Sequence, residues 1–263
     1  MLESVLNPKN AEDKPSHVFG IAVIYSFVAM LFAQQLFPSQ SSMLTIALIT
    51  IIFVPFFQKL FETEETADIT IHKNLYERHK RSILVFSGFF LGTMFAVTGA
   101  YLFSPESHLF TLQTETLQNI GSPTGQAVSS SDFLRFLFNN TKVMTLIFIL
   151  SAVMGAGAVF ILAWNASVIG VFIGLFSQNL AAHTGSIAYI YGIPLALSSI
   201  ALHGIPEILA YFVAGLAGGI LSVGIIREKA FSDNFKIIFK DSVSLFIIAE
   251  SLIIGAALLE ALI

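Results

Sequence analysis

Residues 143–206, VMTLIFILSAVMGAGAVFILAWNASVIGVFIGLFSQNLAAHTGSIAYIYGIPLALSSIALHGIP, contain no Asp, Glu, Lys or Arg. A helix that crosses the hydrocarbon core of a bilayer needs about twenty apolar residues, so this run has room for two or three membrane segments. The run ends in His203-Gly204-Ile205-Pro206-Glu207, which opens another apolar, Gly- and Ala-rich stretch. Ionisable groups are costly at membrane depth and often functional there. The stretch therefore predicts a polytopic membrane protein and marks His203 and Glu207 as candidate functional residues.

The composition of the whole chain agrees with this interpretation. Hydrophobic residues make up 55% of the 263 residues and charged residues only 11%, whereas about a quarter of a soluble domain is charged. The net charge of −4 argues against a nucleic-acid partner, which would need a basic patch. The chain has no cysteine, which excludes thiolate catalysis and Cys-based metal sites. We expect neither a bound metal nor a cofactor.

Charged and turn-forming residues divide the chain into apolar segments. Six segments predict membrane helices at about 18–37, 43–58, 82–103, 143–164, 205–226 and 243–262. Two shorter apolar pieces lie between 165 and 202, separated by Ala181-Ala182-His183-Thr184-Gly185. The sequence therefore predicts an all-α, polytopic transmembrane helical bundle that forms a single integral membrane domain over residues 1–263.

The distribution of Lys and Arg predicts the orientation of the chain. Two connecting segments are rich in basic residues and should be cytoplasmic. Their basic residues are Lys59, Lys73, Arg78, Lys80 and Arg81 in the first segment, and Arg227, Lys229, Lys236 and Lys240 in the second. Residues 1–17 are then a cytoplasmic N-terminal segment, and Ile263 lies outside.

The 104–141 segment should be an extracytoplasmic loop, because Arg135 is its only basic residue. Gly121 to Ser131 is polar and predicts a mobile stretch. Residues 132–138 predict a short interfacial helix, with Ser130 or Ser131 as its cap.

This orientation constrains the middle of the chain. The 143–164 helix arrives inside and the 205–226 helix also ends inside, so an even number of crossings separates the two ends. Three apolar pieces are nevertheless present. Either one of the short pieces is re-entrant or the two form a broken-helix pair, which requires surrounding protein or a water-filled cavity. The alternative is that a helix boundary or the orientation differs from the one assigned.

Two interpretations of His203 and Glu207 are possible. If a helix begins near Gly204, Pro206 sits in its first turn and Glu207 acts as an acid at the positive end of the helix dipole. Alternatively, the two side chains line a polar cavity for a cation, a proton or a basic group of a partner. The string is not a zinc-binding helix, and no Ser-centred nucleophile elbow is present, so we assign no catalytic residue.

Glu250 lies near the middle of the last apolar segment and must be protonated, paired or hydrated there. It serves either as a hydrogen-bonded group between helices or in transport. We expect it to face an Asn, Ser or backbone partner at a site separate from Glu207, because their depths differ by roughly fifteen ångströms. Glu260 is near the helix end and can reach the interface, so it carries no prediction.

Small residues recur at helix-packing spacing and predict close helix contacts or a dimer face. The glycines of these rows are Gly155, Gly170, Gly174, Gly215 and Gly219. Asn140 and Asn165 flank apolar segments and are candidate interhelical hydrogen-bonders.

These residues together are a pattern found in a known family. Asn140, Gly155, Asn165, Gly170, Gly174 and the His203-Gly204-x-x-Glu207 string resemble the stage II sporulation protein M family. The N-terminal half, with Glu3-Ser4, Asn7-Pro8, Ala11-Glu12 and Lys14-Pro15, then Glu62, Glu64 and Glu65, is similar to its archaeal branch. Ala166 departs from the Gly usual after Asn165, which implies a less sharp turn there. In spore-forming bacteria the resemblance implies an integral component of a membrane complex that recruits cell-wall hydrolases.

The leading hypothesis is a non-enzymatic scaffold or partner-recruiting component of a complex in the cell membrane. Its partners would be the bilayer, membrane proteins and a possible second copy of the chain. The alternative is a small transporter or channel that uses His203, Glu207 and Glu250 at membrane depth. An intramembrane enzyme is a third hypothesis, and no recognisable catalytic set supports it.

Overall fold

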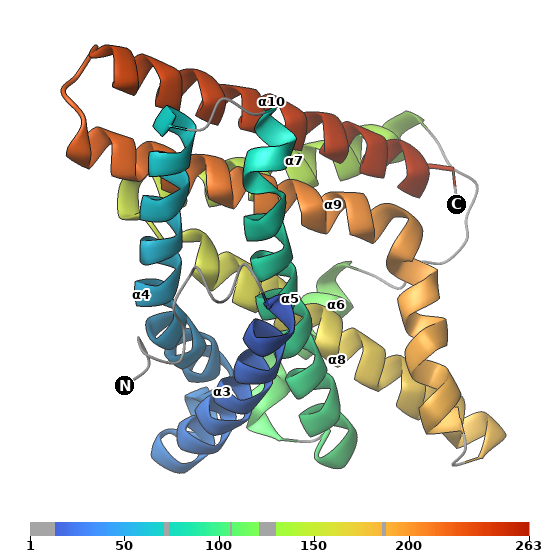
Figure 1. Ribbon diagram of the computed structural model, residues 1–263. Helices are drawn as coiled ribbons and strands as arrows, with labels where there is room; N and C mark the ends of the chain where they lie inside the picture. The colour runs from blue at the N-terminus through green and yellow to red at the C-terminus, as the bar shows by residue number, and fades with distance from the viewer. Residues whose placement is uncertain (1–13, 71–73, 106, 121–129, 186–187, 263) are drawn as a thin grey trace.

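The computed structural model describes residues 14–70, 74–105, 107–120, 130–185 and 188–262. Within these ranges the chain forms α-helices and two short 3-10 helices and no strand, so the predicted all-α class is confirmed (Figure 1). The N-terminal segment before residue 14 and the polar stretch 121–129 lie outside the described residues.

Seven helices of the described residues are long and apolar enough to cross a membrane. The predicted multi-pass helical bundle is therefore confirmed, whereas the odd number of crossings stays a prediction. The α-helices are α3 (Pro15–Leu36), α4 (Ser41–Thr70), α5 (Leu75–Phe103), α6 (Thr111–Ile120), α7 (Ser130–Met154), α8 (Ala158–Thr184), α9 (Ala188–Arg227) and α10 (Asp233–Glu260). The 3-10 helices are η1 (Pro38–Gln40) and η2 (His108–Phe110).

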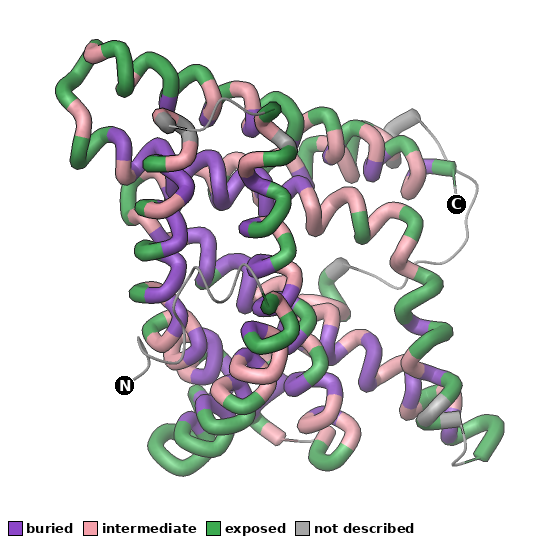
Figure 2. Tube along the Cα trace, viewed as in Figure 1, coloured by how far each residue is buried: buried purple, intermediate pink, exposed green. Residues whose placement is uncertain are grey.

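The helices form two groups that run crosswise to each other (Figure 1). α3 packs on α4 and α5, whereas the second half of α9 packs between α7 and α10. α8 contacts both α5 and α9 and so connects the groups. Buried residues concentrate where the groups meet, and the outer faces of the helices are exposed (Figure 2).

Aromatic side chains fill the centre of this junction. Phe57 on α4 lies with its ring centroid 4.7 Å from that of Phe86 on α5, and Phe53 is equally close to Phe89. Phe212 on α9 stacks on Phe86 at 5.8 Å. Such ring pairs add stabilisation beyond the burial of apolar area, so they fix α9 against the α4–α5 pair.

The predicted helix at 143–164 is wrong in its boundaries. α7 ends at Met154, and α8 begins at Ala158 after the turn Gly155-Ala156-Gly157. Gly155 has φ +69°, a left-handed conformation that glycine adopts without steric cost. Ser151 then accepts a hydrogen bond from the backbone N–H of Ala158 at 3.2 Å, which satisfies one of the free donors at the start of α8.

The predicted helix start near Gly204 is also wrong. The second short apolar piece and the 205–226 segment form one 40-residue helix, α9, which contains Pro194 and Pro206. Proline removes a backbone donor and clashes with the preceding turn, so it kinks a helix rather than starting one here. α9 bends in its middle (Figure 1). Glu207 is therefore not an acid at a helix N-terminus. The re-entrant segment stays a prediction.

Residues 107–120 of the expected outer loop are ordered against the bundle. Gln113 on α6 is buried; it accepts a hydrogen bond from Ser42 on α4 at 2.6 Å and donates one to Ser167 on α8 at 3.1 Å. Residues 132–138, expected to form a separate short helix, instead form part of the first turns of α7. The amphipathic pattern of α6 is too short and too polar to stand out in the sequence.

The two basic connecting segments meet at one end of the bundle. Arg78 at the start of α5 forms an ion pair with Asp241 on α10 at 2.6 Å, and Arg227 at the end of α9 pairs with Glu62 on α4 at 2.8 Å. The segments around residues 59–81 and 227–242 thus share one side, as two loops on the same face of a membrane must. That this side is cytoplasmic stays a prediction.

Cysteine labelling tests the orientation, because the chain has no cysteine of its own. Variants Lys229→Cys and Ser130→Cys are expected to react from opposite sides of sealed vesicles, with Lys229→Cys labelled only from the cytoplasmic side. A cysteine at position 130 that reacts only from the cytoplasmic side would reverse the orientation.

Candidate functional site

Glu207 is held by a hydrogen bond within α9 and lies beside α7. It follows the Pro206 kink, and the hydroxyl of Tyr211, one turn further along α9, donates to its Oε1 at 2.6 Å. The side chain of Asn140 on α7 lies close enough to interact with the carboxyl group of Glu207. Asn140 and Tyr211 are 6% and 2% exposed, so the carboxyl group is held between helices α7 and α9.

The end of α10 brings a second carboxyl group towards this site. Glu260 is close enough to Glu207 and Tyr211 to interact with them electrostatically, and Arg135 on α7 is close to Glu260 in turn. α9 and α10 are antiparallel neighbours, so the end of α10 lies level with the middle of α9. The depth argument that separates Glu207 from Glu250 could have placed Glu260 here.

Glu250 has a partner of its own. Thr141 on α7 donates its hydroxyl to Glu250 Oε1 at 2.9 Å, whereas Oε2 is buried with no hydrogen-bond partner among the described residues. The expected partner was an Asn, a Ser or the backbone, and the observed one is the hydroxyl of a Thr. Because Asn140 and Thr141 are successive residues, α7 holds the carboxyl groups of both Glu207 and Glu250.

His203 forms no hydrogen bond with Glu207 among the described residues. Its Nδ1 is buried and has no hydrogen-bond partner there, and Tyr211 binds Glu207 instead. Asn165 turns back on its own helix and donates to the carbonyl of Ile161 at 2.8 Å. Of the predicted polar residues, the structure thus brings together Asn140 and Glu207. Glu250 of α10 is bound to Thr141, the next residue of α7 after Asn140.

The predicted glycine rows lie against other helices of the same chain. A Cβ atom at Gly170 or Gly174 would meet Val97 or Tyr101 of α5, and one at Gly219 would meet the ring of Phe61 on α4. Gly215 faces Ala158 at the start of α8. Because the glycine rows already pack against helices of the same chain, a homodimer would have to form through another face.

A second polar cluster, which we call the α4–α5 acid cluster, consists of Glu64, His79 and Ser82. Both nearby side chains bind the carboxylate: Ser82 Oγ donates to Glu64 Oε1, and His79 Nδ1 contacts Oε2. All three residues are at most 3% exposed. Ser82 is bound to the carboxylate rather than to the imidazole, so the cluster lacks the Ser–His contact of an activated nucleophile.

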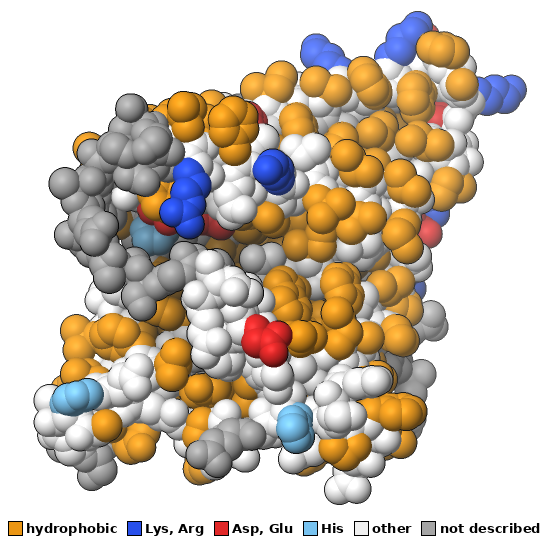
Figure 3. Space-filling view, turned by 180° about the vertical axis from the view of Figure 1, so that it is seen from behind, with side chains coloured by type: hydrophobic (Ala, Val, Ile, Leu, Met, Phe, Trp, Pro, Cys, Tyr) orange, Lys and Arg blue, Asp and Glu red, His pale blue; other side chains and the backbone are white. Residues whose placement is uncertain are grey.

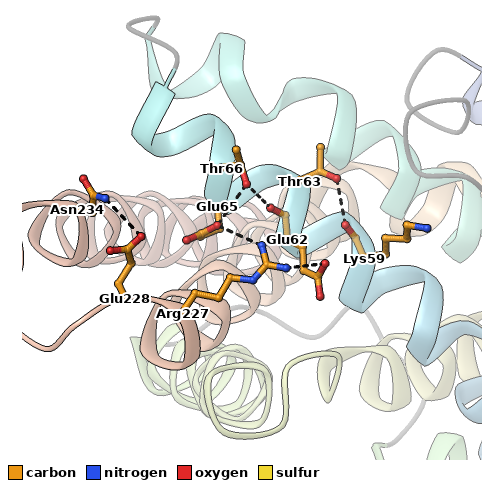
Figure 4. Close-up of polar contacts among 8 residues, drawn as sticks. All are labelled: Lys59, Glu62, Thr63, Glu65, Thr66, Arg227, Glu228 and Asn234. Atoms are coloured by element: carbon orange, nitrogen blue, oxygen red, sulfur yellow. Dashed lines mark hydrogen bonds and ion pairs between the residues drawn. The ribbon is translucent and has the colours of Figure 1, made fainter.

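Ion pairs surround the α4–α5 acid cluster and join α4 to α9 and α5 to α10. Arg227 lies between two carboxylates of α4, 2.8 Å from Glu62 and 3.7 Å from Glu65 (Figure 4). These ion pairs were not predicted from the sequence. The signal in the sequence is that Glu62, Glu64 and Glu65 fall within four positions at the end of an apolar segment. Two Arg-containing segments are predicted on the same side of the membrane.

Tyr211→Phe tests the bond to Glu207. The variant keeps the ring but leaves the half-buried carboxyl group of Glu207 without this hydrogen bond, which costs about 1–3 kcal/mol. We expect a lower melting temperature in detergent. Tyr191→Phe, at an exposed position on the same helix, is the matched control and should melt like the parent protein. An unchanged melting temperature for Tyr211→Phe would show that the bond does not stabilise the fold.

A family match covers the helices on which these residues lie. No curated protein and no solved structure matches the chain. The family model of stage II sporulation protein M matches residues 82–263, which include α7, α9 and α10 and the residues Asn140, His203, Glu207 and Glu250. α3 and α4, with Glu64 of the α4–α5 acid cluster, precede the matched part. The match covers well over half of the chain, which therefore belongs to the stage II sporulation protein M family.

Proposed function

We propose that the protein is a non-enzymatic scaffold that recruits partner proteins into a complex of the cell membrane. The observation that carries the proposal is that half-buried carboxyl groups lie between helices: Glu207 lies beside Asn140, and Glu250 accepts a hydrogen bond from Thr141. Hydrogen bonds between membrane helices fix their relative arrangement. A fixed arrangement is what a scaffold needs to present its loops and outer faces to partners. Membership of the family supports the same function.

Cross-linking in native membranes followed by purification tests the scaffold function. We expect defined membrane proteins to co-purify with the parent chain, and fewer of them with Glu207→Gln, which weakens the contact between α7 and α9. Glu115→Gln changes an exposed acid of α6 and is the matched control. Recovery of the chain without any partner would contradict a recruiting role.

Transport is the second candidate function, and unpaired buried atoms favour it. Glu250 Oε2 and His203 Nδ1 have no hydrogen-bond partner among the described residues. A buried polar atom without a partner costs free energy, and in membrane proteins such groups often belong to proton or ion pathways. A carboxyl group with one free oxygen is suited to accept a proton or a cation.

A flux assay in liposomes separates the two functions. If the protein transports protons or cations, purified parent protein should dissipate an imposed gradient, and Glu207→Gln and Glu250→Gln should each reduce that flux at least tenfold. Glu115→Gln should leave flux unchanged. If the protein is a scaffold, all four proteins should give the flux of empty liposomes, while the cross-linked partners are still recovered from native membranes.

A further inference from the structure

The turn between α9 and α10 exposes an aromatic side chain on an unusual backbone conformation. Phe231 has φ +65° and is 83% exposed. Residues other than Gly, Asn and Asp seldom adopt this left-handed region, and strained residues of this kind gather at functional sites. The turn itself is held in place, because the Ser232 N–H donates to the carbonyl of Lys229 at 3.0 Å and Ser232 Oγ caps α10 by accepting from the Phe235 N–H at 3.2 Å. Packing within the chain does not account for an exposed ring at this position.

Basic residues stand at the head of an exposed apolar face of α10. Lys236 and Lys240 are one helical turn apart and therefore on the same side of the helix. The same side continues at helical spacing with apolar residues, which are Val243, Ile247, Ile254 and Leu258, with exposed fractions of 37%, 59%, 41% and 50%. Along α10, in the direction away from the α9–α10 turn, this exposed face thus changes from basic to apolar.

The acidic residues near the α9–α10 turn leave Lys236 and Lys240 available to bind a ligand. Asp241 is engaged by Arg78, and Glu228 accepts a hydrogen bond from Asn234 at 3.4 Å (Figure 4). Lys240 has no ion pair among the described residues, and Lys236 pairs only with Asp233, at the surface, where such a pair contributes little. Lys and Arg side chains gather at the corner of the molecule over the α9–α10 turn (Figure 3).

We propose that this face binds an anionic phospholipid of the surrounding bilayer. Its headgroup would lie against Lys236 and Lys240, and its acyl chain would follow Val243 and Ile247 along α10. Basic residues next to a membrane helix attract anionic headgroups, and long Lys side chains reach the headgroup level from positions within the helix. Phe231 would be immersed in the interfacial region, where its ring is removed from water. This site is independent of the scaffold function and of the transport function.

A fluorescent reporter at the turn tests the proposal in the full chain. The protein has one Trp, so Trp164→Phe combined with Phe231→Trp gives a single reporter. In nanodiscs of equal parts phosphatidylglycerol and phosphatidylcholine, brominated phosphatidylglycerol is expected to quench the reporter more strongly than brominated phosphatidylcholine. Adding Lys236→Gln and Lys240→Gln should remove this preference, because each Lys near an anionic surface contributes about fivefold in binding.

Two controls keep the outcome specific. Lys142→Gln removes an exposed Lys of α7 and should preserve the preference. Inorganic phosphate should compete no better than sodium chloride of equal ionic strength, since the site takes a lipid rather than a free anion. Equal quenching by both lipids, or a preference unaffected by the double Lys variant, would overturn the proposal and leave the face to an acidic protein partner.

Native mass spectrometry provides a second measurement without the reporter. The chain with its natural Phe231 and Trp164 should retain phosphatidylglycerol over phosphatidylcholine after detergent extraction, and the double Lys variant should retain the two equally. No preference in the natural chain would also overturn the proposal, even if the reporter variants failed to fold.

Discussion

Gly218→Ala is expected to destabilise the protein severely, although it adds only one methyl group. A Cβ atom at Gly218 would meet the carbonyl oxygen of Phe148 and would lie 2.7 Å from Ser151 Cβ and 3.0 Å from the backbone nitrogen of Ala152. Two of these neighbours are backbone atoms of α7, which cannot rotate away. α7 and α9 must therefore separate, and overpacking of this kind typically costs about 1–3 kcal/mol.

The measurement is the melting temperature of the purified protein in detergent. Gly255→Ala is the matched control, because a Cβ atom there meets nothing within 4 Å and alanine favours a helix over glycine by up to about 1 kcal/mol. The control should melt at or above the temperature of the parent protein. If Gly218→Ala melts like Gly255→Ala, α7 and α9 do not pack as closely as the structure shows.

Arg78→Ala should produce a loss of similar or greater size. Arg78 and Asp241 form an ion pair at 2.6 Å that joins α5 to α10, and their side chains are only 8% and 16% exposed, respectively. Removing one partner leaves a mostly buried carboxylate without its counter-charge, which costs about 3–5 kcal/mol in comparable pairs. The variant should melt well below the parent protein, and α10 should become accessible to protease.

A double-mutant cycle with Asp241→Ala isolates the pair. The double variant should be less destabilised than the two single variants added together, because neither charge is then left alone. Lys236→Ala, which breaks the exposed pair with Asp233, is the control and should change stability by less than about 1 kcal/mol. Additive effects of Arg78→Ala and Asp241→Ala would show that the two side chains do not interact.

The apolar segments of the fold could be predicted, but several helix ends could not. The 205–226 segment is apolar apart from a few residues such as Glu207, and its Gly and Pro residues are compatible with either a helix start or a kink. The structure chooses the kink, since residues 188–204 continue the same helix. Conversely, Gly155-Ala156-Gly157 resembles a small-residue packing row, yet it is the turn that separates α7 from α8. The same glycine pattern serves both purposes, and only the surrounding contacts distinguish them.

The sequence predicts which residues belong to the candidate site better than it predicts the contacts between them. Asn140, Glu207 and Glu250 stand out because polar groups are rare in apolar segments. Their partners Tyr211 and Thr141 do not stand out, because a Tyr or a Thr is common in any membrane helix. The different depths of Glu207 and Glu250 predict separate partners, as the structure has them, whereas no contact was predicted for Glu260.

The sequence alone determined that this protein is a multi-pass helical membrane protein, because hydropathy is a property of each segment and needs no knowledge of its neighbours. It also marked Glu207 and Glu250 as acids within apolar segments. Only the tertiary structure decided that α7 holds both Glu207 and Glu250, that α6 packs into the bundle through Gln113, and that Arg78 and Arg227 join helices far apart in the chain. These contacts depend on how helices cross, and crossing is set by the fit of side chains from several segments at once.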